Sequence, residues 1–522
     1  MSFRLTYATM FNPPEEMHER FEKALATMRG RLGATHPMYI DGKDVPAAAT
    51  EEKTSPIDSQ IRIGRFPNAN AQEVDAALAA AHRAFPGWRD AGTAKRVALM
   101  RKVADLIEER VYDIAAALVL EVGKNRLEAL GEAQECVDFF RVYADDFESH
   151  KGYEFDLPDD PSTAFVSRNK SVMRPYGVWA VIAPFNFPIA LAAGPTAAAL
   201  VTGNTVVLKC ASDTPWAGRL LADCIRDAGL PAGAFNYVTG AGSAVGEQMV
   251  RDARTAGATF TGSVAVGRTI MAAMAAGRYA RPYIAEMGGK NPTIVTENAD
   301  LDRAAAGIAR SAYGMGGQKC SALSRLYVHE KVADKLLEKI EKEIDRIRIG
   351  DPSERATLLG PVINRRAYES YARYVADLRS RGAKLRRGGK QPSEGMLGRG
   401  YYVEPVLAEA DPSDPLWKHE MFLPILMVQR YRDREDALRL ANDTDMGLTA
   451  GFYGAPGEVK WFQNGIEAGV TYANRGAGAT TGAWPGYQPF GGWKGSGSSG
   501  KAIASAYYLP LYLREQSRTV VE

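Results

Sequence analysis

Residues 176–209 read YGVWAVIAPFNFPIALAAGPTAAALVTGNTVVLK, and this stretch decides the fold of the chain. Every position before Lys209 is uncharged, over a length greater than the ~20 residues that a membrane-spanning helix needs. However, Pro184, Pro188 and Pro195 interrupt it, and a spanning helix tolerates such interruptions poorly. Long apolar runs are also typical of strands that are buried on both faces. We therefore expect a buried strand, a loop, a helix and a second buried strand.

The same alternation continues on the C-terminal side. FNYVTG at 235–240 and ATFTGS at 258–263 predict two more strands, and a helix over 216–228 precedes them. Strands that alternate with helices predict a parallel sheet covered on both faces, as in nucleotide-binding domains. A second run predicts a second α/β domain, with strands PTIVTE and RLYVHE and helices over 301–313 and 331–347.

The flanking segments predict helices and an arm. Residues 1–37 form a polar extension, with helical spacing over 17–28 that indicates packing. Asn70 with Glu73 predicts a capping box that opens a helix through Ala84. Periodic helices follow over 95–122 and 127–147. The alternating, cationic stretch 162–175 and the strand-like C-terminal end predict a subunit contact, because an edge strand usually needs a partner.

Composition excludes several classes of protein. A chain of 522 residues is too long for one core and predicts two or three domains. With 64 basic and 62 acidic residues, the charge favours neither nucleic acid nor a membrane as partner. The four cysteines and six histidines match no metal or disulfide spacing, which predicts a reducing compartment and no metal. The N-terminal residues lack the apolar core of a signal peptide, so we expect a cytoplasmic protein.

Three polar residues in small-residue or apolar surroundings are candidates for chemistry. Cys320, in GMGGQKCSA at 314–322, reads either as an approachable nucleophile or as a small buried thiol. Lys319 and the open backbone are expected to help form the thiolate. Glu286, in AEMGGKNP, is a candidate base or a structural acid. Asn186, in APFNFP, is a candidate oxyanion donor, because burying an unpaired amide costs about 1 to 3 kcal/mol.

Two glycine-containing turns are candidates for phosphate binding. ATFTGSVAVGR at 258–268 predicts a strand, a turn and a helix whose N-terminus, with Ser263, suits a pyrophosphate. TGAGSAVG at 239–246 departs from the dinucleotide fingerprint, since its third glycine comes one residue too late; it predicts a helix start, with a contact to cofactor as the alternative.

Seven motifs occur in the order and approximate spacing of one enzyme family: APFNFP, VVLKCAS, FTGSVAVG, EMGGK, GQKCS, HEMF and PFGGWKGSG. From about Tyr39 onward the chain therefore resembles the aldehyde dehydrogenase superfamily. The resemblance implies an α/β fold with a Rossmann-type cofactor domain, a second α/β catalytic domain and a β oligomerisation arm. It implies an N-terminal extension over 1–37, an NAD(P)-binding domain over 38–157 and 177–285, a catalytic domain over 286–490, and an oligomerisation arm over 158–176 and 500–522.

The resemblance also implies roles for single residues. Cys320 attacks the aldehyde, the Asn186 amide and the Cys320 N–H hold the oxyanion, and Glu286 deprotonates the water that hydrolyses the thioester. The cofactor is NAD, held by Phe185, Lys209, Ser212, Gly262, Ser263, Gly267, Glu420 and Phe422. Ser212 stands where many NAD-preferring relatives carry a glutamate, which leaves NADP use open. Leu423 stands where many relatives carry a glycine.

Within the superfamily, ECVDFFRVYA at 135–144, the KCS triplet and NRGAGATTGAWPGYQPFGG at 474–492 resemble the glutamate semialdehyde (1-pyrroline-5-carboxylate) dehydrogenases. That group implies substrate contacts from Ser321, Thr481, Gly482 and Ala483, with Glu135 and Lys319 as a charged pair nearby. A loop longer by about three residues, followed by Trp484, keeps another aldehyde or semialdehyde open. Transfer of the acyl group to coenzyme A would not need Glu286, and a catalytically silent relative would not need Cys320.

Overall fold

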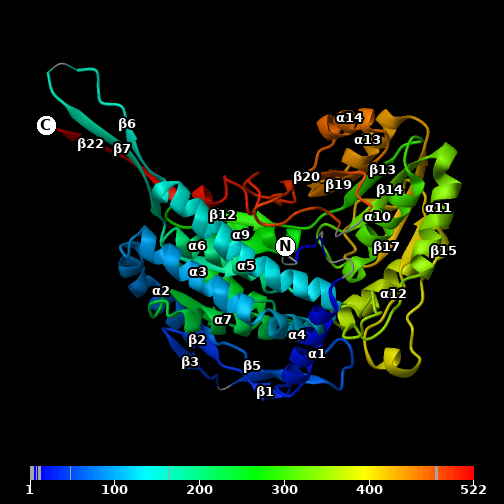
Figure 1. Ribbon diagram of the computed structural model, residues 1–522, viewed down its shortest axis with the longest axis horizontal. Coiled ribbons are helices and arrows are strands. Elements are labelled where there is room, and N and C mark those ends of the chain that lie inside the picture. The colour runs from blue at the N-terminus through cyan, green and yellow to red at the C-terminus, as the bar shows by residue number, and fades with distance from the viewer. Residues whose placement is uncertain (1–4, 8, 10–12, 48, 163, 477–479) are drawn as a thin grey trace.

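The computed structural model describes residues 5–7, 9, 13–47, 49–162, 164–476 and 480–522. Figure 1 shows two α/β lobes side by side and a β arm that extends from one of them. The first lobe contains the strands up to residue 286, apart from the arm, and the second contains those from 291 to 473.

In the described part of the chain, the sheet of the first lobe has the strand order β12-β11-β8-β9-β10-β2-β3. Its strands are β2 (Met38–Ile40), β3 (Lys43–Val45), β8 (Val178–Ile182), β9 (Thr205–Lys209), β10 (Phe235–Val238), β11 (Thr255–Thr261) and β12 (Tyr283–Glu286). Strands β8 to β12 are parallel. The chain runs from β8 outward to β9 and β10 and then returns to the other side of β8, so the order reverses between β8 and β11. Ligands of such sheets bind at that reversal, beyond the carboxyl ends of the strands.

Helices pack against this sheet and against one another. Those in contact with the strands are α2 (Ala71–Arg89), α6 (Ala190–Val201), α7 (Pro215–Ala228), α8 (Glu247–Arg251) and α9 (Val264–Ala275). An outer group consists of α3 (Thr93–Glu109), α4 (Val111–Val122) and α5 (Arg126–Ser149). The capping box at Asn70 is confirmed, since its side chain accepts hydrogen bonds from Gln72 and Glu73 and the Glu73 carboxylate accepts one from the Asn70 N–H. Helix α6 is buried along almost its whole length, as its apolar sequence predicts.

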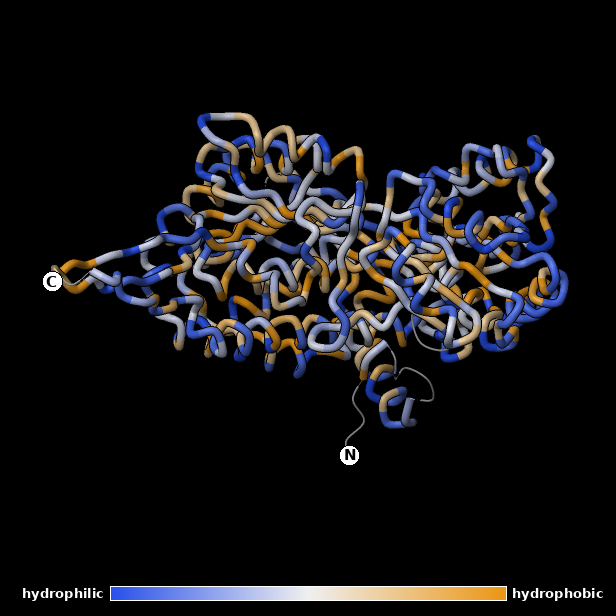
Figure 2. The backbone as a smooth tube through the Cα atoms, turned by 90° about the horizontal axis from the view of Figure 1, so that it is seen from above, coloured by the Kyte–Doolittle hydropathy of each residue, from blue (hydrophilic) through white to orange (hydrophobic). Residues whose placement is uncertain are grey.

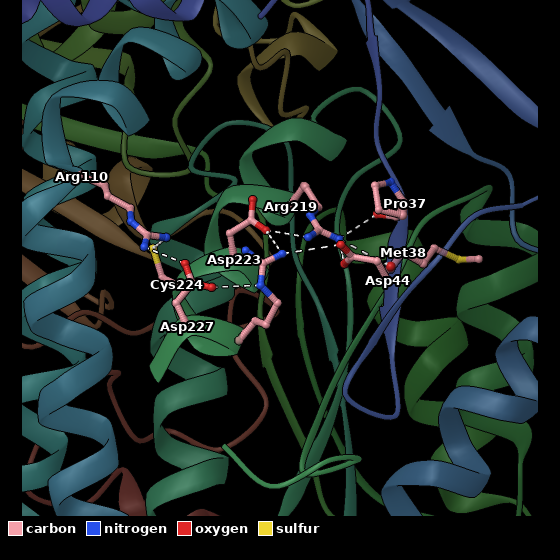
Figure 3. Close-up of polar contacts among 9 residues, drawn as sticks. Pro37, Met38, Asp44, Arg110, Arg219, Asp223, Cys224 and Asp227 are labelled. Atoms are coloured by element: carbon pink, nitrogen blue, oxygen red, sulfur yellow. Dashed lines mark hydrogen bonds and ion pairs between the residues drawn. The ribbon is translucent and has the colours of Figure 1, made fainter. Parts of the chain in front are cut away.

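One predicted helix is wrong: residues 95–122 form two helices that meet at Arg110. Arg110 leaves the helical conformation, with φ of −103° and ψ of 11°. Its guanidinium donates to Asp227 at 2.6 Å and to the Cys224 sulfur at 3.8 Å, both on α7 (Figure 3). The apolar periodicity continues through the break, so the sequence pattern carried no sign of it. Helix α7 also carries Arg219, which donates to Asp44 at 2.7 Å and so ties the β2–β3 hairpin to α7 (Figure 3).

The N-terminal extension packs on the first lobe. Helix α1 (Glu15–Arg29) buries Met17, Phe21 and Met28 and contacts α4. A small sheet beside it contains β1 (Ala34–Thr35), β4 (Thr50–Thr54) and β5 (Arg62–Pro67).

The sheet of the second lobe has the order β15-β16-β17-β14-β13-β19-β20 within the described residues. Its strands are β13 (Asn291–Val295), β14 (Leu323–His329), β15 (Lys384–Arg387), β16 (Val406–Glu409), β17 (Ile425–Tyr431), β19 (Thr449–Tyr453) and β20 (Val470–Ala473). Its helices are α10 (Leu301–Tyr313), α11 (Glu330–Asp345), α12 (Arg365–Ser380), α13 (Arg434–Asn442) and α14 (Val459–Gly465). A short pair, β18 (Met446–Gly447) and β21 (Trp493–Lys494), lies outside this sheet.

Only residues 287–290 separate the end of β12 from the start of β13. The carboxyl end of a strand in the first sheet therefore lies next to the amino end of a strand in the second. Residues that follow the strands of the first lobe meet residues that precede the strands of the second at this junction.

The arm is an antiparallel sheet of β6 (Glu154–Leu157), β7 (Ser167–Pro175) and β22 (Leu513–Val521). Its pairing differs from the predicted boundaries. Residues 154–157, expected in the cofactor domain, pair with β7, while Tyr508 and Tyr512, expected in the arm, are buried in the core of the first lobe. Large apolar side chains are exposed on the arm, and its end is orange in Figure 2: Phe155, Leu157, Phe165, Val166, Val520 and Val521.

Within the described residues, no helix is long and apolar enough to cross a membrane. No group of three histidine, cysteine, aspartate or glutamate side chains in the same residues could hold a metal ion.

Candidate active site

Cys320 lies between α10 and β14, at the junction of the two lobes. The chain before it turns sharply through Met315 and Gly316, with φ of 53° and 63°. The Asn291 amide, at the start of β13, donates to the Cys320 carbonyl at 2.7 Å and to the Ala322 carbonyl at 2.8 Å. The cysteine backbone is thus fixed to the sheet of the second lobe while its side chain stays partly accessible.

The predicted activation of this thiol by Lys319 is wrong for this structure. The Lys319 ammonium lies 2.6 Å from a Glu128 carboxylate oxygen, and this ion pair compensates its positive charge. Burial raises the pKa of Cys320 to about 12, the carboxylates of Glu420 and Glu286 add to the rise, and nearby backbone N–H groups lower it by less. The structure therefore holds Cys320 as a thiol, and the other three cysteines are buried.

Glu286 ends β12, close enough to Cys320 for its charge to act on the thiol. One carboxylate oxygen accepts a hydrogen bond from the Gly492 N–H at 3.1 Å. Burial raises the pKa of Glu286 well above its usual range, and the Gly492 N–H lowers it by less. A carboxyl group with a raised pKa is a better proton acceptor once it is ionised, which suits a general base.

Asn186 lies in the loop between β8 and α6, with 3% of its surface exposed. Its backbone carbonyl accepts a hydrogen bond from Lys124 at 2.8 Å. Lys124 forms an ion pair with Glu132, and both side chains are fully buried. Glu132 also accepts from the N–H groups of Ile189 and Ala190 at 3.0 and 3.2 Å. We name this pair the Lys124–Glu132 clasp; it holds the middle and the C-terminal end of the loop that carries Asn186.

The predicted cofactor residues of the first lobe lie where its parallel strands end. Lys209 ends β9; its ammonium donates to the Cys210 carbonyl at 2.8 Å, and burial lowers its pKa to about 8. The Ser212 hydroxyl donates to the Gly240 carbonyl at 3.0 Å. Ser263 caps α9 and accepts from Val266 at 3.4 Å. An ammonium group, hydroxyls and a helix N-terminus form a donor set that suits phosphates and ribose.

Gly262 and Gly267 are explained by packing. A Cβ atom at Gly262 would lie 2.5 Å from the Phe260 ring, and one at Gly267 would lie 2.4 Å from the Met287 sulfur. Small residues at these positions let the first turn of α9 approach the carboxyl ends of β11 and β12.

Glu420 and Phe422 lie in the second lobe, where Phe422 meets Phe185 of the first lobe across the junction. Glu420 accepts from the Gly289 N–H at 2.8 Å, and burial raises its pKa. The Phe422 ring meets the Phe185 ring edge-on at 5.8 Å, with Phe422 at a φ of 56°. Leu423, the departure from the family pattern, is buried in the core of the second lobe. A carboxylate beside two aromatic rings is suited to a ribose hydroxyl and a flat ring.

A cavity of about 90 Å³ contains the Cys320 side chain, and most predicted substrate contacts line it. Ser321, Thr481 and Ala483 belong to its wall, whereas Gly482 lines a neighbouring cavity. The Thr481 hydroxyl oxygen accepts from the Ala483 N–H at 3.1 Å, which shapes the turn. Residues 477–479, where the longer loop was expected, lie outside the described residues.

Glu135 and Lys319, predicted as a charged pair near the substrate, both line the Cys320 cavity, but they do not pair with each other, because each side chain has another partner. Lys319 pairs with Glu128, and Glu135 accepts from the Tyr7 hydroxyl at 2.8 Å. Trp484 donates to Asp138 at 2.6 Å. Sequence reasoning missed Tyr7 and the Lys124–Glu132 clasp. A lone tyrosine in a polar extension has no motif, and Lys124 and Glu132 stand among other charged residues, Arg126 and Glu128, so their surroundings in the sequence carried no sign of a buried pair.

The two-lobed α/β fold with its Rossmann-type sheet is that of the aldehyde dehydrogenases, and the chain belongs to the aldehyde dehydrogenase family, whose model matches residues 45–517. The predicted resemblance and fold class are thus confirmed. Among named relatives, the chain is similar to 1-pyrroline-5-carboxylate dehydrogenase of a Geobacillus species, with 35% identity and 97% of each chain covered. It is also similar to 1-pyrroline-5-carboxylate dehydrogenase 2 of Bacillus subtilis, with 36% identity over 97% of this chain and 96% of that one. The structure of 1-pyrroline-5-carboxylate dehydrogenase from Thermus with bound NAD matches with a TM-score of 0.92 and 34% identity, covering 100% of this chain and 99% of that chain.

Proposed function

We propose that this chain oxidises L-glutamate γ-semialdehyde to L-glutamate with NAD. The observation that carries the proposal is the wall of the Cys320 cavity, where the hydroxyl groups of Ser321 and Thr481 supply donors for a carboxylate. The names of the relatives support it, because they match over nearly the full length of both chains.

The residues divide the reaction among them. Cys320 loses its proton to solvent and its sulfur bonds to the aldehyde carbon, while the Asn186 amide and the Cys320 N–H hold the oxyanion. Loss of a hydride from that carbon to the cofactor would then leave the thioester. No described group hydrogen-bonds the Asn186 side chain, so its amide is available to donate. Glu286 then takes a proton from the water that attacks the thioester, which releases the carboxylic acid and restores the thiol.

NAD bound at the junction accepts the hydride. Lys209, Ser212 and the α9 N-terminus with Ser263 would hold its adenosine and phosphates, and Glu420 with Phe422 its nicotinamide ribose. The first lobe thus acts as the cofactor domain and the second as the catalytic domain. Ser212 places no carboxylate against a 2′-phosphate, so NADP is accepted as a weaker cofactor.

The test compares initial rates for glutamate semialdehyde and pentanal with NAD. A site built around a carboxylate leaves its donors unpaired when the substrate lacks one, so we expect a preference of about 100-fold or more in kcat/KM for glutamate semialdehyde. A preference for pentanal, or equal rates, would refute glutamate semialdehyde as the substrate and leave oxidation of some other aldehyde as the function. Absence of turnover with any aldehyde would indicate a silent relative.

For assembly we propose a homo-oligomer joined through the arm. Its exposed apolar side chains, among them Leu157 and Val520, form a surface of the kind that a second copy covers. Light scattering should show the full chain as a dimer or larger, and the variant Val520→Asp with Val521→Asp should reduce its mass. We also propose a cytoplasmic location, since all four cysteines are free thiols.

A further inference from the structure

Tyr7 reaches the Cys320 cavity from the N-terminal extension, far from the other lining residues in sequence. Its ring lies edge-on to Trp484, with centroids 5.0 Å apart, and edge-on to Phe187 at 6.3 Å. Phe187 follows Asn186, and Trp484 follows the Thr481 turn. The tyrosine therefore joins the two loops that carry the proposed oxyanion donor and the proposed carboxylate contacts.

The backbone that carries Tyr7 is held by its own turn. The Thr9 N–H donates to the Thr6 carbonyl at 3.1 Å, and the Thr6 N–H donates to the Thr9 hydroxyl at 2.8 Å. The Tyr7 hydroxyl adds an anchor on α5, because it donates to Glu135 at 2.8 Å. Backbone and side chain are thus both fixed.

Tyr7 also separates three adjacent cavities. It lines the cavity of about 90 Å³ around Cys320, a second of about 310 Å³ that includes Arg475 and Tyr487, and a third of about 450 Å³ that includes Asn125 and Leu359. The ring thus forms part of the boundary of the inner cavity. Without the ring, space for a longer chain would open beyond the reacting carbon.

We propose that Tyr7 is a specificity-determining residue, whose ring closes the aldehyde pocket against longer substrates and whose hydroxyl orients the Glu135 carboxyl group. The inference rests on the proposed function in one respect, that Cys320 is the nucleophile in this cavity. Burial raises the pKa of Glu135 to about 8, and the hydrogen bond from Tyr7 opposes that rise. The hydroxyl therefore favours the carboxylate beside the pocket, where the ammonium of an amino-acid semialdehyde would benefit from it.

The test measures the ratio of kcat/KM for nonanal to that for pentanal in wild type, Tyr7→Ala and Tyr7→Phe. We expect Tyr7→Ala to raise the ratio about 10-fold or more, since each methylene that fits an apolar pocket contributes about 10-fold or more. Tyr7→Phe keeps the ring and should leave the ratio unchanged. The matched control is Tyr487→Ala, which removes an exposed tyrosine that lines only the 310 Å³ cavity. A ratio in Tyr7→Ala no higher than in Tyr487→Ala overturns the proposal.

The hydroxyl has a separate readout. Without its hydrogen bond the pKa of Glu135 rises, so Tyr7→Phe should move the acidic limb of kcat/KM to higher pH with glutamate semialdehyde and leave it in place with pentanal. If the acidic limb of kcat/KM does not move with either aldehyde, the proposed role of the hydroxyl is refuted. If Tyr7→Ala does not fold, Tyr7→Leu is measured with the same aldehydes.

Alkylation of Cys320 tests whether the Tyr7 ring closes the cavity, and it does not require turnover. We expect Tyr7→Ala to raise the rate with a pyrene maleimide at least 10-fold relative to the rate with iodoacetamide, measured above the background of Cys320→Ser. If the wild type oxidises no aldehyde but Tyr7→Ala shows this change in alkylation, the proposed function is refuted and the closure of the cavity by Tyr7 stands. If the wild type oxidises aldehydes but Tyr7→Ala shows no change, only the closure by Tyr7 is refuted.

Discussion

The Lys124–Glu132 clasp allows stability and catalytic positioning to be separated. Glu132→Gln keeps an acceptor oxygen for the Ile189 and Ala190 N–H groups and removes only the charge. The Lys124 ammonium is then left without a counter-ion in a fully buried site, where in the wild type it lies 2.8 Å from the Asn186 carbonyl and 4.1 Å from the centroid of the Phe187 ring. Breaking a buried pair by removing one partner costs about 3–5 kcal/mol, which is a large share of the ~5–15 kcal/mol that stabilises a typical domain.

The activity of this variant should fall as well. The freed lysine draws away from the Asn186 carbonyl, and the amide loses its position; complete loss of one oxyanion donor costs about 100-fold to 1000-fold in kcat. We therefore expect Glu132→Gln to lower the urea midpoint and to lower kcat by about 10-fold to 100-fold, with little change in KM.

A double variant, Lys124→Met with Glu132→Gln, distinguishes the two effects. It removes both charges and fills the lysine volume, so it should be more stable than Glu132→Gln alone by urea unfolding, because no uncompensated charge remains. Its kcat should stay low, since no ammonium holds the Asn186 carbonyl. A double variant that recovers full kcat, or a single variant that loses less than about 1 kcal/mol, would refute the reasoning.

Three further predictions follow from single residues. Asn186→Ala should lower kcat about 100-fold to 1000-fold in steady-state assays with the KM for aldehyde little changed; a loss confined to KM would argue for a binding role. Because the pKa of Cys320 is raised to about 12, its thiolate fraction and its alkylation by iodoacetamide should rise about 10-fold per pH unit from pH 7 to pH 10; a plateau below pH 8 would contradict the raised pKa. Burial raises the pKa of Glu121 to about 8, so its contribution to stability is present at acid pH and lost as pH rises toward 8; the free energy of unfolding should fall less between pH 5 and pH 8 in Glu121→Gln, and an equal fall would exclude Glu121 as a cause.

Local patterns predicted the elements of both lobes well where one face or one terminus decided the structure. Helix α10 occupies the predicted residues 301–313, because it has a clear apolar period and a clear end. The break at Arg110 was not predictable, since it depends on an aspartate and a cysteine that lie more than a hundred residues away on α7. Tertiary contacts decide such points.

The candidate site follows the same rule. Glu286, Cys320 and Asn186 were found because each has a motif of small or apolar neighbours, and the fold brings all three to the junction of the lobes. The partners of Lys319 and Glu135 were not found, since both have several carboxylates and hydroxyls within possible reach and only the packing of α5 and the N-terminal extension selects Glu128 and Tyr7.

Burial gives the site its electrostatic character. The pKa values of Cys320, Glu286 and Glu420 are all raised, and burial lowers that of Lys290 to about 7, so the groups at the junction favour their uncharged forms. The carboxylates of Glu286 and Glu420 disfavour the thiolate of Cys320, and Lys319 forms an ion pair with Glu128 instead. A positive charge that enters the junction would therefore favour ionisation of Cys320, and by reciprocity the thiolate would favour binding of that charge. Burial and the two carboxylates thus favour the thiol form of Cys320, and only a compensating positive charge at the junction would oppose them.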